Sequence, residues 1–99
     1  MRLDFEFHPA AEEEFAVSSD YYFAVNPRFE VEFLDIAYEA SGHICRNPKS
    51  CPLVIDTVRR KVLNKFPYSI FYIERPSIIL IIAIAQHKRR PFYWTTRIQ

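Results

Sequence analysis

Residues 78–85, eight consecutive apolar positions and most of them β-branched, constrain the fold of this chain more than any other segment. Such a run is typical of a strand at the centre of a sheet, with both of its faces covered. It is far shorter than the ~20 residues that a helix needs to span a bilayer. The N-terminal residues Met-Arg-Leu-Asp include no apolar signal segment. We therefore expect a soluble cytoplasmic protein built around a sheet.

Two helices are predicted ahead of that strand. Apolar and acidic residues alternate over 3–7, which predicts a short strand, and Pro9 then begins a helix that runs to about residue 24. Its acidic first turn, Glu12–Glu14, is interpreted as solvated. Asn26 and Pro27 are a capping residue and a first helical residue, and they predict a second helix over 27–46. The linker is so short that the two helices should form an antiparallel hairpin.

The second helix has the clearest apolar stripe of the chain. Its members recur at helical spacing and predict one buried face. They are Phe29, Phe33, Ile36, Ala37, Ala40 and Ile44.

The remainder of the chain has the composition of strands. Residues 47–56 are interpreted as a proline-containing loop, and strands are predicted over 57–63, 68–74 and 78–85. The first strand should join an edge of the sheet beside a later strand. The order β-α-α-β-β-β predicts an α+β domain in which a helical hairpin packs on one face of a mostly antiparallel, twisted sheet. With 99 residues, the chain has room for one domain, spanning 1–99.

The charged residues divide between the two parts of the chain. Residues 1–40 carry ten acidic and two basic side chains, and residues 41–99 carry eleven basic and two acidic ones. The apolar fraction of 49% and the aromatic fraction of 16% exclude intrinsic disorder. We expect an acidic helical face and a basic working face, which would attract phosphate groups or acidic partners. The alternative is that the charges pair across the fold.

Neither metal nor disulfide chemistry is indicated. Cys45 and Cys51 do not make a disulfide framework, and no histidine accompanies them at the spacing of a zinc site. We expect two reduced thiols, no bound metal and no cofactor.

Basic and aromatic side chains gather at two points of the predicted sheet. Arginine clamps a phosphate, histidine can donate a proton to a leaving oxygen, and tyrosine can stack on a base or help to move a proton. Together they could cleave a phosphodiester. The alternatives are a solvated or partner-binding patch, a structural histidine and an aromatic cap on the core. The residues are Arg59, Arg60, Lys61 and Lys65, followed by His87, Lys88, Arg89, Arg90, Tyr93 and Trp94.

Several segments match one known pattern in their order. They are Phe-His-Pro-Ala-Ala-Glu-Glu-Glu at 7–14, Asp-Tyr-Tyr at 20–22, Asn-Pro at 47–48, Arg-Arg at 59–60, Lys-Phe-Pro-Tyr-Ser-Ile-Phe-Tyr at 65–72 and, most specific, Ile-Ala-Gln-His-Lys-Arg-Arg-Pro-Phe-Tyr-Trp at 84–94. Over nearly its whole length the chain thus resembles the RelE/ParE toxin superfamily. The resemblance implies a toxin of a type II toxin–antitoxin pair, which is neutralised by a co-expressed antitoxin.

The superfamily that the chain resembles holds two activities. RelE-like members cut mRNA in the ribosomal A site through attack by a 2′-hydroxyl, whereas ParE-like members poison DNA gyrase and lack the catalytic set. Carried over to this chain, Arg59 or Arg60 matches the mid-sheet arginine. His87, Arg89 and Arg90 match the C-terminal basic group, and Tyr93 matches the terminal aromatic residue. Gln86 stands where a second histidine is usual, and Phe92 stands where glycine is usual.

We therefore expect a toxin that acts on the ribosome and mRNA and binds a cognate antitoxin with an acidic segment. Gyrase poisoning, or an inactive member that only binds its antitoxin, remain the alternatives. The expected catalytic residues are Arg59, Arg60, His87, Arg89 and Tyr93, and the expected RNA-binding residues are Lys61, Lys65, Lys88, Arg90 and Trp94.

The two neighbouring arginines should point to opposite faces of the sheet, because side chains alternate along a strand. Val58 and Val62 share a face with Arg60. If that face meets the helices, Arg59 is the catalytic candidate and Arg60 is structural.

Overall fold

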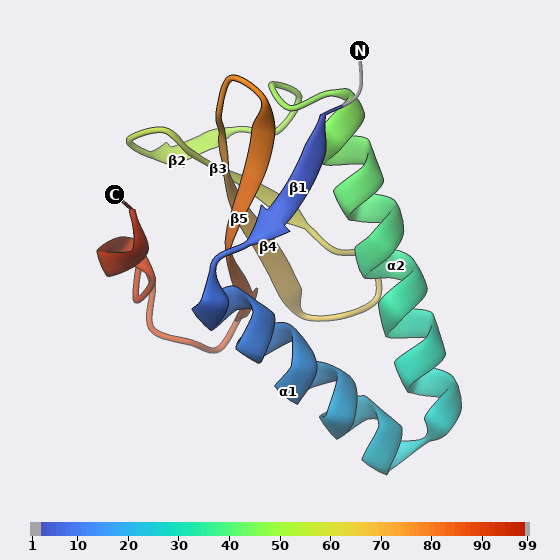
Figure 1. The fold of residues 1–99 in the computed structure, drawn as a ribbon. Helices are drawn as coiled ribbons and strands as arrows, with labels where there is room; N and C mark the ends of the chain where they lie inside the picture. The colour runs from blue at the N-terminus through green and yellow to red at the C-terminus, as the bar shows by residue number, and fades with distance from the viewer. Residues whose placement is uncertain (1–2, 99) are drawn as a thin grey trace.

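The computed structural model describes residues 3–98 and has the α+β architecture that the sequence predicts (Figure 1). In chain order the elements are β1 (Asp4–Phe7), α1 (Pro9–Val25), α2 (Pro27–Arg46), β2 (Leu53–Ile55), β3 (Val58–Val62), β4 (Tyr68–Glu74), β5 (Ile78–Gln86) and a 3-10 turn, η1 (Thr95–Arg97). No helix in this part of the chain is both long and apolar enough to cross a membrane.

The sheet has the strand order β1-β5-β4-β3-β2. β1 pairs with β5 in parallel, and the other neighbours pair antiparallel, so the mostly antiparallel sheet is confirmed. The expectation that the first strand joins an edge beside a later strand is confirmed as well.

The loop predicted over 47–56 is wrong in its second half, because Leu53–Ile55 forms the edge strand β2. Leu53 pairs with Arg59 and Ile55 pairs with Val58, so β2 and β3 form a tight hairpin. Asp56 makes this turn with a φ of 52°, a left-handed conformation that aspartate tolerates. A three-residue strand between Pro52 and a turn is too short to show an alternating pattern.

Both helices begin where the sequence places them. The His8 Nδ1 accepts a hydrogen bond from the Ala10 amide at 3.0 Å, and the Asn26 Oδ1 accepts one from the Arg28 amide at 2.9 Å. Each cap satisfies an amide that the first turn of a helix leaves without a partner. Asn26 ends α1 and caps α2, so the chain reverses over one residue.

The helical hairpin extends beyond the sheet at its tip (Figure 1). Along α2, the predicted positions Phe33, Ala37, Ala40 and Ile44 are buried. Phe29 was expected on the same stripe, but it is 44% exposed. It lies in the first turn of α2 and therefore next to the tip, where the sheet no longer covers the helix.

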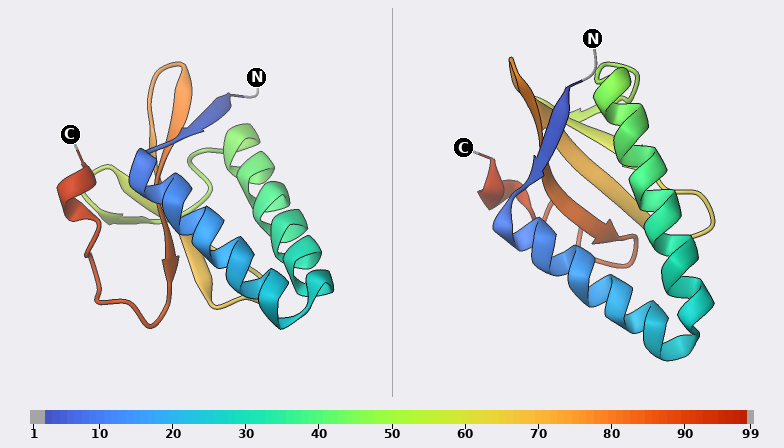
Figure 2. Two further views of the ribbon diagram at one scale, coloured as in Figure 1. Left: turned by 60° about the horizontal axis from the view of Figure 1, so that its bottom comes forward. Right: turned by 45° about the vertical axis from the view of Figure 1, so that its right-hand side comes forward.

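The sheet is covered on both faces, as the apolar run over 78–85 predicts. One cluster of buried side chains joins the helices to one face, and a second cluster joins the opposite face to the C-terminal tail, residues 87–98. Figure 2 shows the helices and the tail on opposite sides of the sheet. In β5 the register shifts, so that Ile82 and Ala83 both belong to the tail side. This β-bulge changes the face toward which each later residue of β5 points.

Glu14 contradicts the interpretation of a solvated acidic turn. β1 ends at Phe7, so the second half of β5 has no strand on that side. Side chains take the place of the missing strand: the Ile84 amide donates to Glu14 Oε1 at 3.1 Å, and Arg97 Nη1 donates to the Ile82 carbonyl at 2.9 Å. Arg97 also donates to both oxygens of Glu14, at 2.9 and 3.1 Å. The carboxylate therefore closes an open edge of the sheet.

The two cysteines are buried and form no disulfide with each other. Cys45 lies in the last turn of α2, and Cys51 lies in the loop that leads to β2.

Candidate functional site

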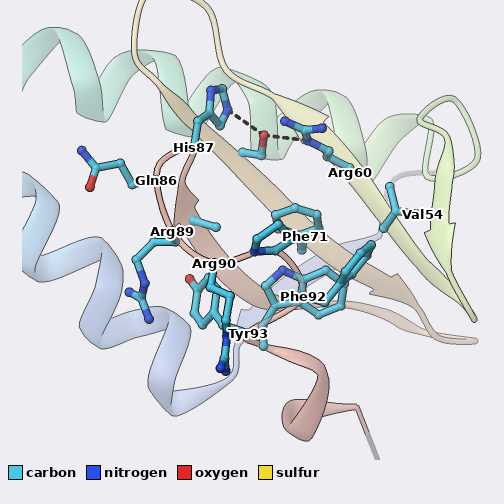
Figure 3. Close-up of a pocket in the computed structure, with 13 residues that line it drawn as sticks. Val54, Arg60, Phe71, Gln86, His87, Arg89, Arg90, Phe92 and Tyr93 are labelled. Atoms are coloured by element: carbon cyan, nitrogen blue, oxygen red, sulfur yellow. Dashed lines mark hydrogen bonds between the residues drawn. The ribbon is translucent and has the colours of Figure 1, made fainter.

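A cavity of about 260 Å³ opens on the tail side of the sheet, between β3, β4 and the segment that follows β5. Its polar wall is made by Arg60, Ser69, Gln86, His87, Arg89 and Arg90. Its apolar wall includes Phe71, Phe92, Tyr93 and Trp94. Figure 3 shows how the labelled side chains surround it. No aspartate or glutamate among the described residues lines this cavity, so its charge is positive.

Three strands bring an arginine and a histidine to one serine. Arg60 lies on β3, Ser69 lies on β4, and His87 follows the end of β5. The Arg60 Nε donates to Ser69 Oγ at 2.9 Å, and Ser69 Oγ lies 3.0 Å from His87 Nε2 (Figure 3). Since arginine can only donate, the Ser69 proton remains available for His87 when Nε2 is the acceptor. The serine is 1% exposed and thus fixes both side chains from beneath.

The backbone holds His87 at the mouth of the cavity. The His87 amide donates to the Pro67 carbonyl at 2.8 Å, which extends the β4–β5 pairing by one bond. The backbone bond thus fixes the position of His87, and the contact with Ser69 orients its ring.

Aromatic rings form the apolar wall. Trp94 is 1% exposed and lies 4.6 Å from Phe71, centroid to centroid, with the planes tilted by 34°. Phe92 meets Trp94 edge-on at 5.8 Å. The Arg60 guanidinium lies 5.9 Å from the Phe71 centroid. The cavity thus places a cation beside aromatic surface, a combination that suits a nucleotide.

Tyr93 lines the cavity, but its hydroxyl is engaged elsewhere. It donates to Glu14 Oε2 at 2.6 Å, and Arg89 stacks on the ring with 3.8 Å between guanidinium and centroid. Arg89 also pairs with Glu14 at 3.9 Å. Burial, together with the hydrogen bond and the charge of Glu14, raises the pKa of Tyr93 well above its usual range. The phenol is therefore held protonated.

The two arginines of β3 point to opposite faces of the sheet, as alternation predicts. Val58 packs with Trp94 on the tail side, so the face of Val58 and Arg60 does not meet the helices. Arg60 reaches the cavity. Arg59 points the other way and donates to the carbonyls of Cys51 at 2.7 Å and Lys49 at 3.4 Å. Arg59 would be the catalytic candidate only if the face of Val58 and Arg60 met the helices, and that face meets the C-terminal tail instead.

The remaining predicted residues fall into two groups. Arg89, Arg90, Tyr93 and Trp94 line the cavity with Arg60 and His87, and Trp94 is the buried part of its apolar wall. The lysines do not line it. Lys61 borders a different hollow beside α2, Lys65 pairs with Glu32 at 3.8 Å, and Lys88 is exposed in the turn after β5. This arrangement leaves the arginines as the cations of the cavity.

Sequence reasoning missed Ser69, Phe71 and Glu14 as parts of the site. Alternation could have found the first two, because Ser69 and Phe71 share a face of β4 and Phe71 pairs with Arg60. Glu14 gave no signal, since its partners lie about seventy or more residues away in the sequence.

Metal-ligating side chains do not gather near the cavity. Within residues 3–98, no three histidine, cysteine, aspartate or glutamate side chains form a group that could hold a metal ion.

The expected division of charge is partly compensated by pairing. Ion pairs join Lys65 to Glu32 and join Arg89 and Arg97 to Glu14. Some charges therefore pair across the fold, while the cavity keeps a basic face.

Alkaline pH should destabilise the fold through its buried phenols. Burial is the main cause of two further shifts. It raises the pKa of Tyr22 to about 12 and raises the pKa of Tyr72 by a larger amount. Unfolded tyrosines ionise near 10. The free energy of unfolding should therefore be unaffected by these groups below pH about 10 and fall as the pH rises toward the folded-state values. Urea unfolding across this range checks it, and Tyr93→Phe should make the fall shallower. If the free energy of unfolding of this variant falls as steeply with pH as that of the parent, Tyr93 does not contribute to the fall.

Comparison with known proteins agrees with this architecture. Neither a family model nor a curated protein sequence matches the chain. A solved structure does match, described as the chromosomal ParDE TA system from P. aeruginosa. The superposition has a TM-score of 0.73 at 16% sequence identity and covers 86% of this chain and 96% of that chain. This chain therefore shares the fold of the matching chain of that ParDE system.

Proposed function

We propose that this protein is the toxin of a type II toxin–antitoxin pair and that it arrests growth by cutting mRNA at the ribosome. The observation that carries the proposal is the meeting of Arg60 and His87 on Ser69, in a cavity that has further arginines and an aromatic wall. A guanidinium, an imidazole and aromatic surface are the groups that hold a phosphate, move a proton and receive a base.

In the proposed reaction the 2′-hydroxyl of the nucleotide before the cut attacks the adjacent phosphorus. The 2′-oxygen–phosphorus bond forms, the bond to the 5′-oxygen breaks, and the products are a 2′,3′-cyclic phosphate and a 5′-hydroxyl. His87 donates a proton to the departing 5′-oxygen, and the proton of the 2′-hydroxyl passes to water. Arg60 binds the phosphate and stabilises the additional negative charge of the transition state. Arg89 and Arg90 hold the neighbouring backbone.

Tyr93 has a supporting role in this proposal. Its hydroxyl is bonded to Glu14, and its raised pKa keeps it protonated. It therefore supports Arg89 through ring stacking and does not act as a base.

Poisoning of DNA gyrase is the second candidate. The observations that favour it are the likeness to a ParDE structure and the cavity's lack of an acidic residue, among those described, that could accept the proton of a 2′-hydroxyl. In that case Arg60 and His87 would contact gyrase and perform no chemistry. Both targets imply a cytoplasmic protein.

The proposed partner is a cognate antitoxin, as the description of the matching structure suggests. An acidic segment would fit the arginines around the cavity and block it. Val17 and Tyr21, which are exposed apolar residues of α1, offer a second contact. Co-expression with the neighbouring reading frame, followed by purification of this chain, tests the pairing.

Induced expression with two parallel assays separates the candidate targets. Pulse labelling measures protein synthesis, and plasmid topoisomers measure gyrase activity in the same culture. The proposal predicts that protein synthesis stops first while plasmid supercoiling is retained. Loss of supercoiling ahead of the loss of translation would replace the mRNA proposal with the gyrase candidate.

A further inference from the structure

Phe92 has a backbone conformation that a bulky residue rarely adopts. Its φ is 60°, in the left-handed region that favours glycine. The other described non-glycine residues with positive φ are Asp56 and Lys65, in the turns after β2 and β3. An aromatic residue costs conformational energy at such a position, and residues held this way cluster at functional sites. The side chain of Phe92 should therefore have a use that offsets the strain.

The ring of Phe92 is placed on the rim of the cavity. It is 47% exposed, whereas its neighbour Trp94 is buried. Its contact with Trp94 is edge-on, with the two planes at 65°. Figure 3 shows Phe92 in the same cavity as Arg60 and Arg90. The cavity thus offers a partly open aromatic surface beside cations.

The segment that carries Phe92 is fixed on both sides. Before it, the His87 amide is bonded to Pro67, and the Arg89 amide to Gln86. After it, the Phe92 carbonyl accepts from the Thr95 amide at 3.1 Å, and the Tyr93 hydroxyl is bonded to Glu14. The surrounding structure therefore maintains the strained conformation.

We infer that Phe92 is the stacking residue of this site and that it receives an unpaired nucleobase of the RNA whose phosphate lies at Arg60 and His87. The inference rests on the proposed function and adds the residue that positions a nucleobase of the mRNA. A base in a duplex has both faces covered, whereas an unpaired base can stack on an exposed aromatic ring. Stacking is sequence-tolerant, so Phe92 would fix the position of a nucleotide and accept any of the four bases.

The test separates stacking from folding through the choice of variants. Phe92→Gly and Phe92→Asn remove the ring and suit the left-handed conformation, so both should fold. Phe92→Tyr keeps the ring. Phe23→Ala is the matched control, because Phe23 is 53% exposed on α1 and does not line the cavity. Fluorescence of Trp94, the one tryptophan of the chain, reports stability during urea unfolding.

The activity readout is the cleavage rate of a synthetic mRNA bound to ribosomes, measured against toxin concentration. Phe92→Gly and Phe92→Asn should need about 5- to 150-fold more protein for half-maximal rate. Phe92→Tyr and Phe23→Ala should match the parent. Stability of the glycine variant should equal or exceed that of the parent, since the strain is relieved.

An abasic nucleotide provides the matching change in the RNA. Placed next to the cleavage position, the abasic nucleotide should raise the concentration of parent protein needed for half-maximal rate as much as the loss of the ring does. It should not raise that concentration further for Phe92→Gly. Additive losses, or a glycine variant with the parent's concentration dependence, would overturn the inference. The inference would also be overturned if the variants lost activity in proportion to their loss of stability and Phe92→Tyr did not restore it. A parent that cuts no mRNA would overturn the proposed function, and the stacking role with it, before any variant is compared.

Discussion

Replacing Glu14 with alanine should lower the free energy of unfolding by about 3–5 kcal/mol, because it leaves a buried cation without its partner. The Glu14 and Arg97 side chains are only 12% and 15% exposed. The change removes the acceptor of the Ile84 amide, the Tyr93 hydroxyl and two Arg97 nitrogens together. In a domain of this size the midpoint of thermal unfolding should fall by about 15–30 °C. Thermal and urea unfolding followed by circular dichroism measure it.

Two variants give this prediction its controls. Glu13 is the exposed neighbour of Glu14, and Glu13→Ala should change stability by less than about 0.5 kcal/mol. Glu14→Gln keeps one oxygen that can accept from the Ile84 amide, but it loses the charge and replaces the second oxygen, which accepts from the Tyr93 hydroxyl, with an NH2 group. Its loss of stability should therefore be intermediate. Equal stability of Glu13→Ala and Glu14→Ala would show that the carboxylate does not close the edge of β5.

An apolar pair should not rescue this position. Buried ion pairs can often be replaced by apolar residues without loss of stability. Here the pair also satisfies the Ile84 amide and the Ile82 carbonyl of β5. A Glu14→Leu, Arg97→Met double variant would leave both backbone groups buried without partners, and it should stay less stable than the parent.

Arg60→Ala should lower the rate of mRNA cleavage by about 10²–10³-fold, the usual cost of removing one group that stabilises transition-state charge. Arg59→Ala is the matched control. Arg59 neighbours Arg60 on β3 and has the same side chain, but it bonds to the Cys51 carbonyl on the other face of the sheet. Its loss should lower stability and leave the cleavage rate of the folded protein unchanged. Single-turnover cleavage of ribosome-bound mRNA measures both variants.

His87→Ala should lower the cleavage rate in the same assay, since the leaving oxygen then has no proton donor. Ser69→Ala should have a smaller effect, because Ser69 only orients Arg60 and His87. If Arg59→Ala abolishes cleavage while Arg60→Ala retains it, the assignment of the two faces of β3 to their roles is wrong.

Local signals predicted most of the fold. Three signals depend only on residues that are close in the sequence, and all three were confirmed. They are the helix start at Asn26 and Pro27, the stripe from Phe33 to Ile44 and the apolar run over 78–85. β2 was missed because three residues are too few to show a period. Phe29 was misplaced because helical spacing identifies a face of the helix but not how far the sheet extends beneath it.

The site was only partly predictable for a related reason. Alternation established that Arg59 and Arg60 point to opposite faces, but the choice between them depended on which face the helices cover. Tertiary packing decides which face the helices cover, and it places Val58 in the buried cluster that joins the sheet to the C-terminal tail. Glu14 shows the same limit, because its role depends on where β1 ends relative to β5.

The ends of the cut mRNA test the central claim most directly. Purified protein is added to ribosomes programmed with a defined mRNA, and the chemistry of the two new ends is determined. The proposed role of Arg60 and His87 predicts a 2′,3′-cyclic phosphate on the upstream fragment and a 5′-hydroxyl on the downstream one, with both products lost in Arg60→Ala. Intact mRNA, or a 5′-phosphate on the downstream fragment, would contradict it.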